Sequence, residues 1–432
     1  MNIVVRFFVA FVLCLGLGAC AQRQEGASPS ATLVTEWTLT ADYYGRGAPN
    51  WRTLAIMHRA MHDALNAARP TYARWSPPAP DEPAGRDADP NVAMAAAAAE
   101  VLRQLHPGHL RNTERVIDRT LGRLPDGSAK SAGIALGTAI GVAEVRRRAE
   151  DGWTRSRRFA GGEGTGRWRP TPTRFATSPT NDIRPFLFAR TTDVAAVPPP
   201  AIGSPAYLSS RAEVRRLGVG SSKERTNFQS DEALFWDRQL TQRGMVRLAT
   251  ELMNRHPREG GVFDHARIMA QLTAALADSA ILIWWEKERF SFWRPVTAIM
   301  LGNDGGPVDA NWLPLIETPP FPEYPAGHSS DCYVGADVLQ AAFPDARQPV
   351  EYQAVAGGVT RPGDEHTGMG QYGQGYNEDD FERSYPSLRE MAETCANSRI
   401  WAGVHFRFGN EESRRVATLI VEKALAAVPK TR

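Results

Sequence analysis

The sequence has few cysteines, almost no net charge and no long apolar stretch after its first residues. Four cysteines in 432 residues are too few for a disulfide-rich scaffold. A formal net charge of +2 excludes a global field that would attract nucleic acid, so basic residues must act locally. The composition, 42% hydrophobic and 23% charged, is that of an ordinary globular protein with a large core.

The N-terminus is typical of an exported protein. Arg6 precedes an apolar run from Phe7 to Ala19, which predicts a signal peptide over residues 1–19. The run ends in Leu-Gly-Ala-Cys, which resembles the lipobox of bacterial lipoproteins; that resemblance implies acylation at Cys20 and a lipid anchor in the membrane. The expected location is the cell envelope, on the periplasmic face of the outer membrane. The alternative is a signal peptide cleaved nearby without lipidation.

Residues 20–33 follow as a predicted flexible tether, because Gln, Gly, Ala and Ser dominate them. Removal of Cys14 and acylation of Cys20 would leave Cys332 and Cys395. An oxidising compartment permits a bridge between these two, and the sequence leaves open whether they form a disulfide or remain two free thiols.

Helical periodicity dominates the rest of the chain. Apolar residues at helical spacing or capping signals predict helices over 51–68, 91–105, 128–150, 231–254, 265–285, 327–342, 381–396 and 411–427. Gly and Pro recur from Trp153 to Pro205, which predicts a long wrap without regular structure, and residues 357–375 form a second Gly-rich loop. We find no strand alternation. The fold class is all-α, in helical bundles with long connecting loops: a region over 34–205 and a helical domain over 206–432.

Three segments carry residues that suit oxyanion chemistry. The first contains K-x6-R-P, from Lys287 to Arg294 and Pro295. Seven residues make about two helical turns, so the two cations can share a face, and the proline predicts that Arg294 lies at a helix end. By itself such a pair is more often a solvated face.

The second segment is rich in proline and ends in Ala326-Gly327-His328, at the start of a predicted helix. A helix N-terminus presents free N–H groups to an anion, and glycine lets the anion approach the backbone. His328 suits a general acid or base. The third segment contains Arg399 and His405, whose spacing requires the chain to bend, and Gly403 permits that bend. Taken alone, these segments are better explained as a turn, a surface arginine and a buried histidine.

The order K-x6-R-P, P-x-G-H, S-R-x5-H resembles the signature of the vanadium haloperoxidase and type-2 phosphatidic acid phosphatase superfamily, in its bacterial haloperoxidase-related lipoprotein branch. The resemblance implies that vanadate or phosphate oxygens are bound by Lys287, Arg294, Arg399 and the Gly327 N–H. It implies that His405 is the vanadium ligand or the nucleophile, that His328 is the acid–base residue, and that Trp284 and Phe321 shape a halide pocket.

Two residues depart from the family pattern. Ala326 replaces the usual serine, which removes a hydroxyl hydrogen bond worth about 1 to 2 kcal/mol. Gly409 replaces the acidic residue usual shortly after the third-motif histidine. We also expect Asp237 to support Arg399. His58 and His62, four apart on a helix, lack the glutamate of a zinc motif and are expected to be structural.

The resemblance implies an enzyme that uses vanadate as cofactor and oxidises halide with hydrogen peroxide. Two alternatives use the same pocket. One is a phosphatase without a cofactor, which hydrolyses phosphomonoesters through a phosphohistidine; the other is a phosphate-binding envelope protein without catalysis. All three take small molecules rather than nucleic acid, and the sequence does not indicate an oligomeric state.

Overall fold

The computed structural model describes residues 29–45, 50–122, 124–155, 157–170, 177–178, 182–237, 239–344, 349–353 and 382–431. Within these ranges it has thirteen α-helices. They are α2 (Pro29–Tyr44), α3 (Trp51–Ala68), α4 (Pro90–Leu105), α5 (Leu110–Leu121), α6 (Ser128–Arg147), α7 (Pro205–Leu217), α8 (Asn227–Asp237), α9 (Thr241–Arg255), α10 (Val262–Phe290), α11 (Pro295–Leu301), α12 (Gly327–Ala342), α13 (Leu388–Trp401) and α14 (Arg407–Ala426).

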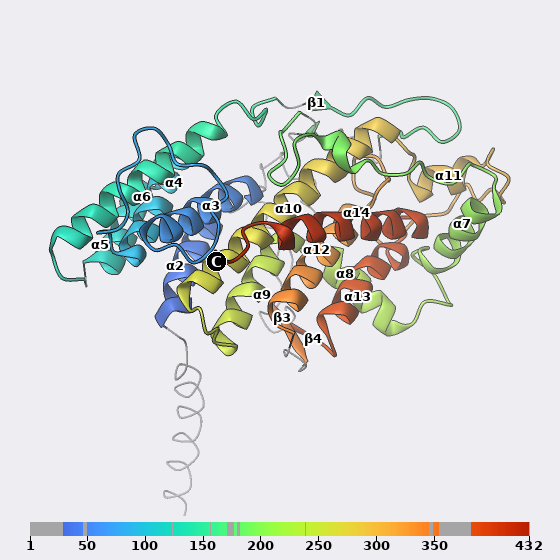
Figure 1. The fold of residues 1–432 in the computed structure, drawn as a ribbon. Coiled ribbons are helices and arrows are strands. Elements are labelled where there is room, and N and C mark those ends of the chain that lie inside the picture. Colours follow the sequence, from blue (N-terminus) through green and yellow to red (C-terminus); the bar gives the residue numbers. More distant parts are fainter. Residues whose placement is uncertain are drawn as a thin grey trace, which may run out of the picture.

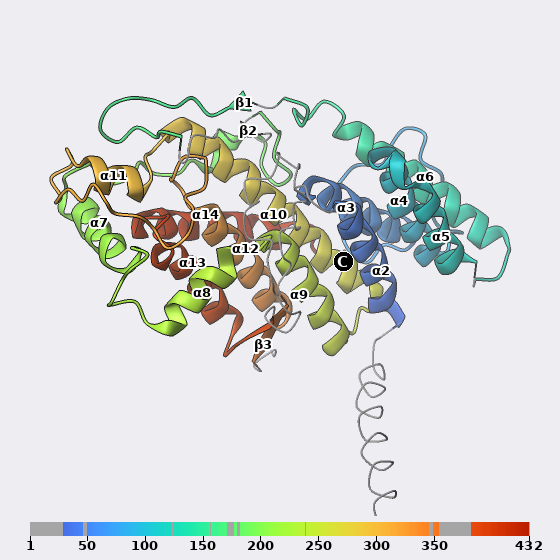
Figure 2. The ribbon, with the colours of Figure 1, turned by 180° about the vertical axis from the view of Figure 1, so that it is seen from behind.

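Short elements complete the fold. Two 3-10 helices and two antiparallel pairs of strands are present: η1 (Pro107–His109), η2 (Thr191–Val194), β1 (Arg157–Arg158) with β2 (Thr177–Ser178), and β3 (Val350–Gln353) with β4 (Glu382–Tyr385). Helices α2 to α6 gather at one end of the molecule, and α7, α8, α11 and α13 lie at the other (Figures 1 and 2). The prediction of an all-α protein is confirmed.

Small residues set the packing of the N-terminal helices. Gly133, Gly137 and Gly141 recur every fourth residue of α6, so they lie on one helix face. A Cβ added at Gly137 would lie 2.1 Å from the carbonyl oxygen of Ala93 on α4. The glycines therefore allow α6 to approach the alanine-rich α4 far more closely than larger side chains would.

Helix α10 is the central element of the bundle. It packs against α3 at the N-terminal end of the molecule and against α12 and α14 at the other (Figure 1). In the described residues it is the one helix long and apolar enough to cross a membrane, with a mean hydropathy of 1.4. Because 89% of that stretch is buried within the protein, we interpret α10 as a core helix.

The Gly/Pro-rich wrap from Trp153 to Pro205 is held against the bundle by buried carboxylates. Asp278 of α10 accepts hydrogen bonds from the backbone N–H groups of Phe186 and Leu187, at 2.6 and 2.7 Å. Glu286 accepts from the N–H of Ala196 at 2.6 Å. The described parts of the wrap lie over α10 and α14 with few regular elements, as expected from their composition (Figure 1).

The structure corrects several predicted boundaries. Helix α2 begins at Pro29, inside the predicted tether over residues 20–33, and the helices α2, α5, α7 and α11 were not predicted. The helix expected over 231–254 is two helices, α8 and α9, and two short strand pairs form where no strands were expected. The signal peptide, Cys20 and the loop over 357–375 lie outside the described residues.

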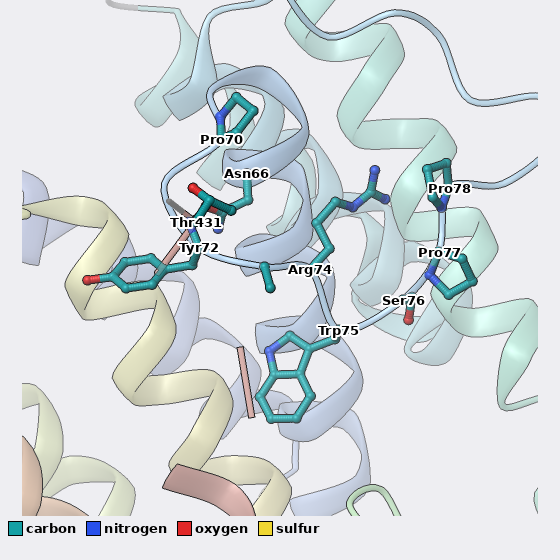
Figure 3. A pocket seen from close by; sticks show the side chains of 10 residues that line it. Asn66, Pro70, Tyr72, Arg74, Trp75, Ser76, Pro77, Pro78 and Thr431 are labelled. Atoms are coloured by element: carbon teal, nitrogen blue, oxygen red, sulfur yellow. The ribbon is translucent and has the colours of Figure 1, made fainter. Parts of the chain in front are cut away.

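The C-terminal residues pair with the segment that follows α3. Tyr72 and Lys430 form an isolated antiparallel bridge, and Thr431 donates its N–H to the carbonyl oxygen of Thr71 at 3.0 Å. This pairing borders a surface hollow that Trp75 and a run of prolines also line (Figure 3). None of the oxyanion-binding residues predicted from the sequence lines it.

A disulfide joins α12 to α13. The sulfur atoms of Cys332 and Cys395 are bonded, across 63 residues of sequence. The Cys395 sulfur also lies 3.6 Å from the carbonyl oxygen of His328. The bridge therefore ties the helix that begins at Gly327 to the helix that carries Arg399, which answers the question that the sequence left open.

We predict that the double substitution Cys332→Ser and Cys395→Ser lowers the free energy of unfolding by about 4 kcal/mol, because the open chain regains the entropy of a long loop. Denaturant unfolding of the oxidised proteins measures this difference. Reductant should destabilise the wild type and leave the double variant unchanged. Equal unfolding midpoints for the two oxidised proteins would show that the disulfide contributes nothing to stability.

Candidate functional site

The residues of the three sequence motifs lie at helix ends that meet on one side of the bundle. Lys287 lies in the last turn of α10, and Arg294 precedes α11. Gly327 and His328 begin α12, whereas Arg399 and His405 flank the junction of α13 and α14. Arg294, Lys287, Arg399 and His328 all perturb the pKa of His405 electrostatically, so the structure brings all three segments together.

The helix that carries Lys287 ends before Arg294. Helix α10 ends at Phe290, and Ser291 has a left-handed backbone with φ of 43°. Arg294 is extended and acts as the N-cap of α11, with Pro295 at the first helical position. The spacing predicted that the two cations share one helix face, and the structure shows that they do not. The proline correctly predicted that Arg294 lies outside a helix.

The ammonium group of Lys287 is hydrogen-bonded to three backbone carbonyl groups. Its Nζ lies 2.9, 2.8 and 2.5 Å from the carbonyl oxygens of Pro322, Glu323 and Pro325. Three acceptors match the three N–H groups of an ammonium group. Lys287 thus holds the proline-rich segment in place, and it can bind an oxyanion only if it releases one of these carbonyl groups.

Arg294 and His405 are in direct contact. Arg294 Nη1 lies 3.0 Å from His405 Nε2 and donates to the carbonyl oxygen of Val404 at 2.7 Å. A guanidinium group can only donate, so Nε2 must offer a lone pair. His405 Nδ1 then carries the proton, and it lies 2.8 Å from Oε1 of Glu323. His405 is therefore neutral, with Nε2 as its nucleophilic or ligating atom.

Several buried donors of the site have no acceptor among the described residues. They are Nη2 of Arg294 and Nε and Nη1 of Arg399. Nε2 of His328 is also buried without a partner there, and in the neutral ring it can offer a lone pair. A Cβ added at Gly327 would meet nothing within 4 Å, so space lies beside the start of α12. Ala326, the N-cap, provides no side-chain oxygen to the first N–H groups of the helix. Such a set of donors is complementary to an oxyanion.

Asp237 contacts Arg399 as expected. Its Oδ1 lies 3.5 Å from Arg399 Nη2, at the C-terminus of α8. This carboxylate partly balances the arginine while leaving its other two nitrogens available. The bend predicted between Arg399 and His405 is also present, because α13 ends at Trp401 and Gly403 has φ of 83°.

Burial and like charge shift the ionisation of the whole cluster. Burial, followed by the charge of Arg294, lowers the pKa of Lys287, while Glu323 opposes this shift. Burial lowers the pKa of Arg294 to about 9. Burial and Arg399 lower the pKa of His328 far below its usual range. Each shift shows that the positive charges are incompletely compensated, so a bound anion would be stabilised here.

Glu323 is a site residue that sequence reasoning missed. It is fully buried, and its Oε1 accepts hydrogen bonds from His405 and from the backbone N–H of Phe406. Burial raises the pKa of Glu323 to about 7, whereas Lys287 and Arg294 act in the opposite direction. A glutamate inside a proline-rich segment gives no periodic signal, so only the fold links it to a histidine 82 residues away.

Aromatic rings cover one side of the cationic cluster. The rings of Trp284 and Phe321 lie 4.8 Å apart, and Phe159 of the wrap stacks on Trp284 at 5.7 Å. The guanidinium carbon of Arg294 lies 4.8 Å from the centre of the Phe321 ring, and Lys287 Nζ lies 5.4 Å from it. Two of these residues were predicted as a halide pocket, and Phe159 was not.

Comparison with known proteins identifies the segment that carries the site. The family model described as the VCPO second helical-bundle domain matches residues 267–431. Vanadium chloroperoxidase from Curvularia inaequalis is 29% identical over 206 aligned residues, which cover 38% of this chain and 31% of that protein. Over residues 267–431, this chain is similar to the vanadium haloperoxidase superfamily.

Solved structures of haloperoxidases have the same fold. A bacterial vanadium-dependent iodoperoxidase matches with a TM-score of 0.69 and 22% identity, over 93% of this chain and 96% of that one. A holo-type bacterial vanadium-dependent chloroperoxidase matches with a TM-score of 0.60 and 18% identity, over 87% and 90%. The alignment with the curated haloperoxidase from Curvularia spans only about a third of that protein's length.

The histidines on α3 have partners within the protein. His58 and His62 are fully buried. His58 Nε2 lies 3.3 Å from the Thr38 hydroxyl, and His62 lies between Asp63 and Asn66, at 3.2 and 3.3 Å. Burial lowers the pKa of His58 to about 3. These contacts fit the structural role expected of both residues.

We predict that oxyanion binding to this pocket weakens as pH rises. The pKa of His328 is low in the free site and would rise beside an anion, so binding takes up protons and is favoured at low pH. Uptake of one proton changes affinity by up to about tenfold per pH unit.

Sulfate is a suitable probe because its charge stays constant from pH 6 to 9. Calorimetric titrations in two buffers of different ionisation enthalpy give both affinity and proton uptake. His328→Gln should take up fewer protons than the wild type. Tighter binding at pH 9 than at pH 6 would contradict the prediction.

Proposed function

We propose that this protein is a vanadate-dependent haloperoxidase, which oxidises halide with hydrogen peroxide. The observation that supports this most directly is the set of buried N–H donors on Arg294 and Arg399, which have no acceptor among the described residues. They lie around a neutral His405 whose Nε2 carries a lone pair. The fold supports the same proposal, since the solved proteins to which this chain is similar are named as vanadium-dependent peroxidases.

The donor set fits a tetrahedral oxyanion. Arg294 and Arg399 would each provide free guanidinium N–H groups, and the Gly327 N–H would add a backbone donor at the start of α12. His405 Nε2 would bind vanadium, after Arg294 turns its Nη1 from that nitrogen to an oxygen of the anion. When bound, vanadate supplies the electrophilic centre at which peroxide is activated toward halide.

His328 and the aromatic residues would act on the two substrates. The low pKa of His328 leaves its ring neutral, so Nε2 can accept a proton from hydrogen peroxide as it enters. Trp284, Phe321 and Phe159 would form an apolar wall for the halide, with Lys287 and Arg294 supplying positive charge at its edge. The wall also excludes water, which strengthens these interactions.

We predict that orthovanadate-loaded protein brominates or iodinates a phenolic indicator in the presence of peroxide, and that His405→Ala abolishes this activity. Loss of the only ligating nitrogen should reduce the rate by at least about a hundredfold. His106→Ala is a matched control, because His106 is half-buried and lies outside the site. Both variants should unfold near the wild-type temperature.

The same preparations should be tested for hydrolysis of an aryl phosphate. Hydrolysis that vanadate inhibits, without halogenation, would overturn the proposal in favour of a phosphatase. Absence of both activities, with sulfate binding intact, would indicate an anion-binding protein without catalysis. Ala326 makes this comparison informative, since it removes a side-chain donor from the pocket.

We propose further that the protein is exported and anchored by lipid at Cys20. The lipobox-like end of the apolar segment supports this, and the Cys332–Cys395 disulfide is expected in an oxidising compartment. Labelled palmitate should be incorporated into the wild type expressed in a bacterial host, and Cys20→Ser should lose the label and the membrane fraction. Equal labelling of both proteins would refute the anchor.

A further inference from the structure

The carboxylate of Glu323 fills the space that a side chain at position 409 would occupy. A Cβ added at Gly409 would lie 2.5 Å from Oε1 of Glu323 and 3.3 Å from its Oε2. Real Cβ atoms do not approach an oxygen so closely. A side chain at position 409 would therefore force the Glu323 carboxylate to shift from its present place, although the two residues come from different motifs.

The shared place lies beside His405. Oε1 of Glu323 accepts from His405 Nδ1 at 2.8 Å and from the Phe406 N–H at 3.1 Å. Gly409 lies in the first turn of α14, four residues after His405. A carboxylate carried by residue 409 would thus reach the region that the Glu323 carboxylate now fills.

The backbone of Gly409 is fixed by the second motif. Its carbonyl oxygen accepts from the Ala326 N–H at 3.2 Å and from the Ser413 hydroxyl at 2.8 Å. The Ser413 hydroxyl also lies 2.8 Å from the carbonyl oxygen of Ala326. Because these contacts hold α14 and the start of α12 together, position 409 cannot move aside to make room for a side chain.

We propose that Glu323 is the positioning residue of His405 and that Gly409 exists to leave room for it. The proposal rests on the proposed function, since it concerns the nitrogen that would bind vanadium. Glu323 accepts the Nδ1 proton and so keeps the Nε2 lone pair directed into the site. The carboxylate that serves His405 comes from the second motif, whereas the family resemblance places an acid at the position of Gly409.

The decisive experiment combines substitutions at the two positions. Glu323→Ala should weaken vanadate binding by about 10- to 100-fold, as loss of an outer partner of a ligating histidine does. Gly409→Asp should also weaken binding, because its side chain collides with Glu323. The double variant Glu323→Ala with Gly409→Asp should recover most of the affinity, so Gly409→Asp should be harmful in one background and beneficial in the other.

A matched double variant separates charge from volume. Glu323→Ala with Gly409→Leu fills the same space without a carboxylate and should not recover affinity. Affinity is measured by calorimetric titration of the full-length, metal-free proteins with orthovanadate. Recovery by leucine as well as by aspartate, or additive losses in the aspartate double variant, would overturn the proposal.

A second measurement remains decisive if the wild type does not bind vanadate, an outcome that would refute the proposed function alone. In protein with ¹⁵N-labelled histidine, the resonances missing from His405→Ala report the His405 tautomer. The wild type and the aspartate double variant should show a proton on Nδ1, and Glu323→Ala should show a mixture of tautomers. An unchanged spectrum in Glu323→Ala would refute the positioning role.

Discussion

The structure depends on keeping three cations away from water with too few opposing charges nearby. Lys287, Arg294 and Arg399 are each at most 1% exposed, and within the described part of the chain the carboxylates in contact with the cluster are Glu323 and Asp237. Removing a charged group from water costs several kcal/mol unless other groups replace the lost hydration. Carbonyl groups of irregular segments do so here, and helix ends are where a bundle can offer them.

This constraint explains why the cations and histidines of the site lie at or next to helix termini. The interior of the bundle is apolar, and its helical backbone has already used its own polar groups. The carbonyl groups that Lys287 contacts come from the proline-rich segment before α12. Arg294 donates to the carbonyl oxygen of Val404, next to the turn at Gly403 between α13 and α14. The wrap closes the site, since two backbone hydrogen bonds join it to the end of α10. Trp168 donates its N–H to the carbonyl oxygen of Ser291, and Trp293 donates its N–H to that of Gly166.

The sequence predicted the parts of this arrangement that depend on local rules. The bounds of α12, the break at Gly403 and the extended backbone of Arg294 follow from glycine, proline and helical periodicity. The prediction that Lys287 and Arg294 share a helix face was wrong, because it assumed a continuous helix and the chain makes a left-handed turn between them. Glu323 was missed because its partner is fixed only by the packing of α14 against the second motif.

The free hydrogen-bonding groups limit what the pocket can bind, whichever reaction follows. Among the described residues of the site, the unpaired buried donors are N–H groups of Arg294 and Arg399, so a metal cation would be repelled by two guanidinium groups. A neutral ligand would leave the desolvated charges uncompensated. An oxyanion accepts hydrogen bonds from these donors and also compensates the buried positive charge. The lone pair on His405 Nε2 can then act as a ligand to vanadium or as a nucleophile toward phosphorus, so the pocket fixes the class of ligand, and the identity of the bound oxyanion selects the reaction.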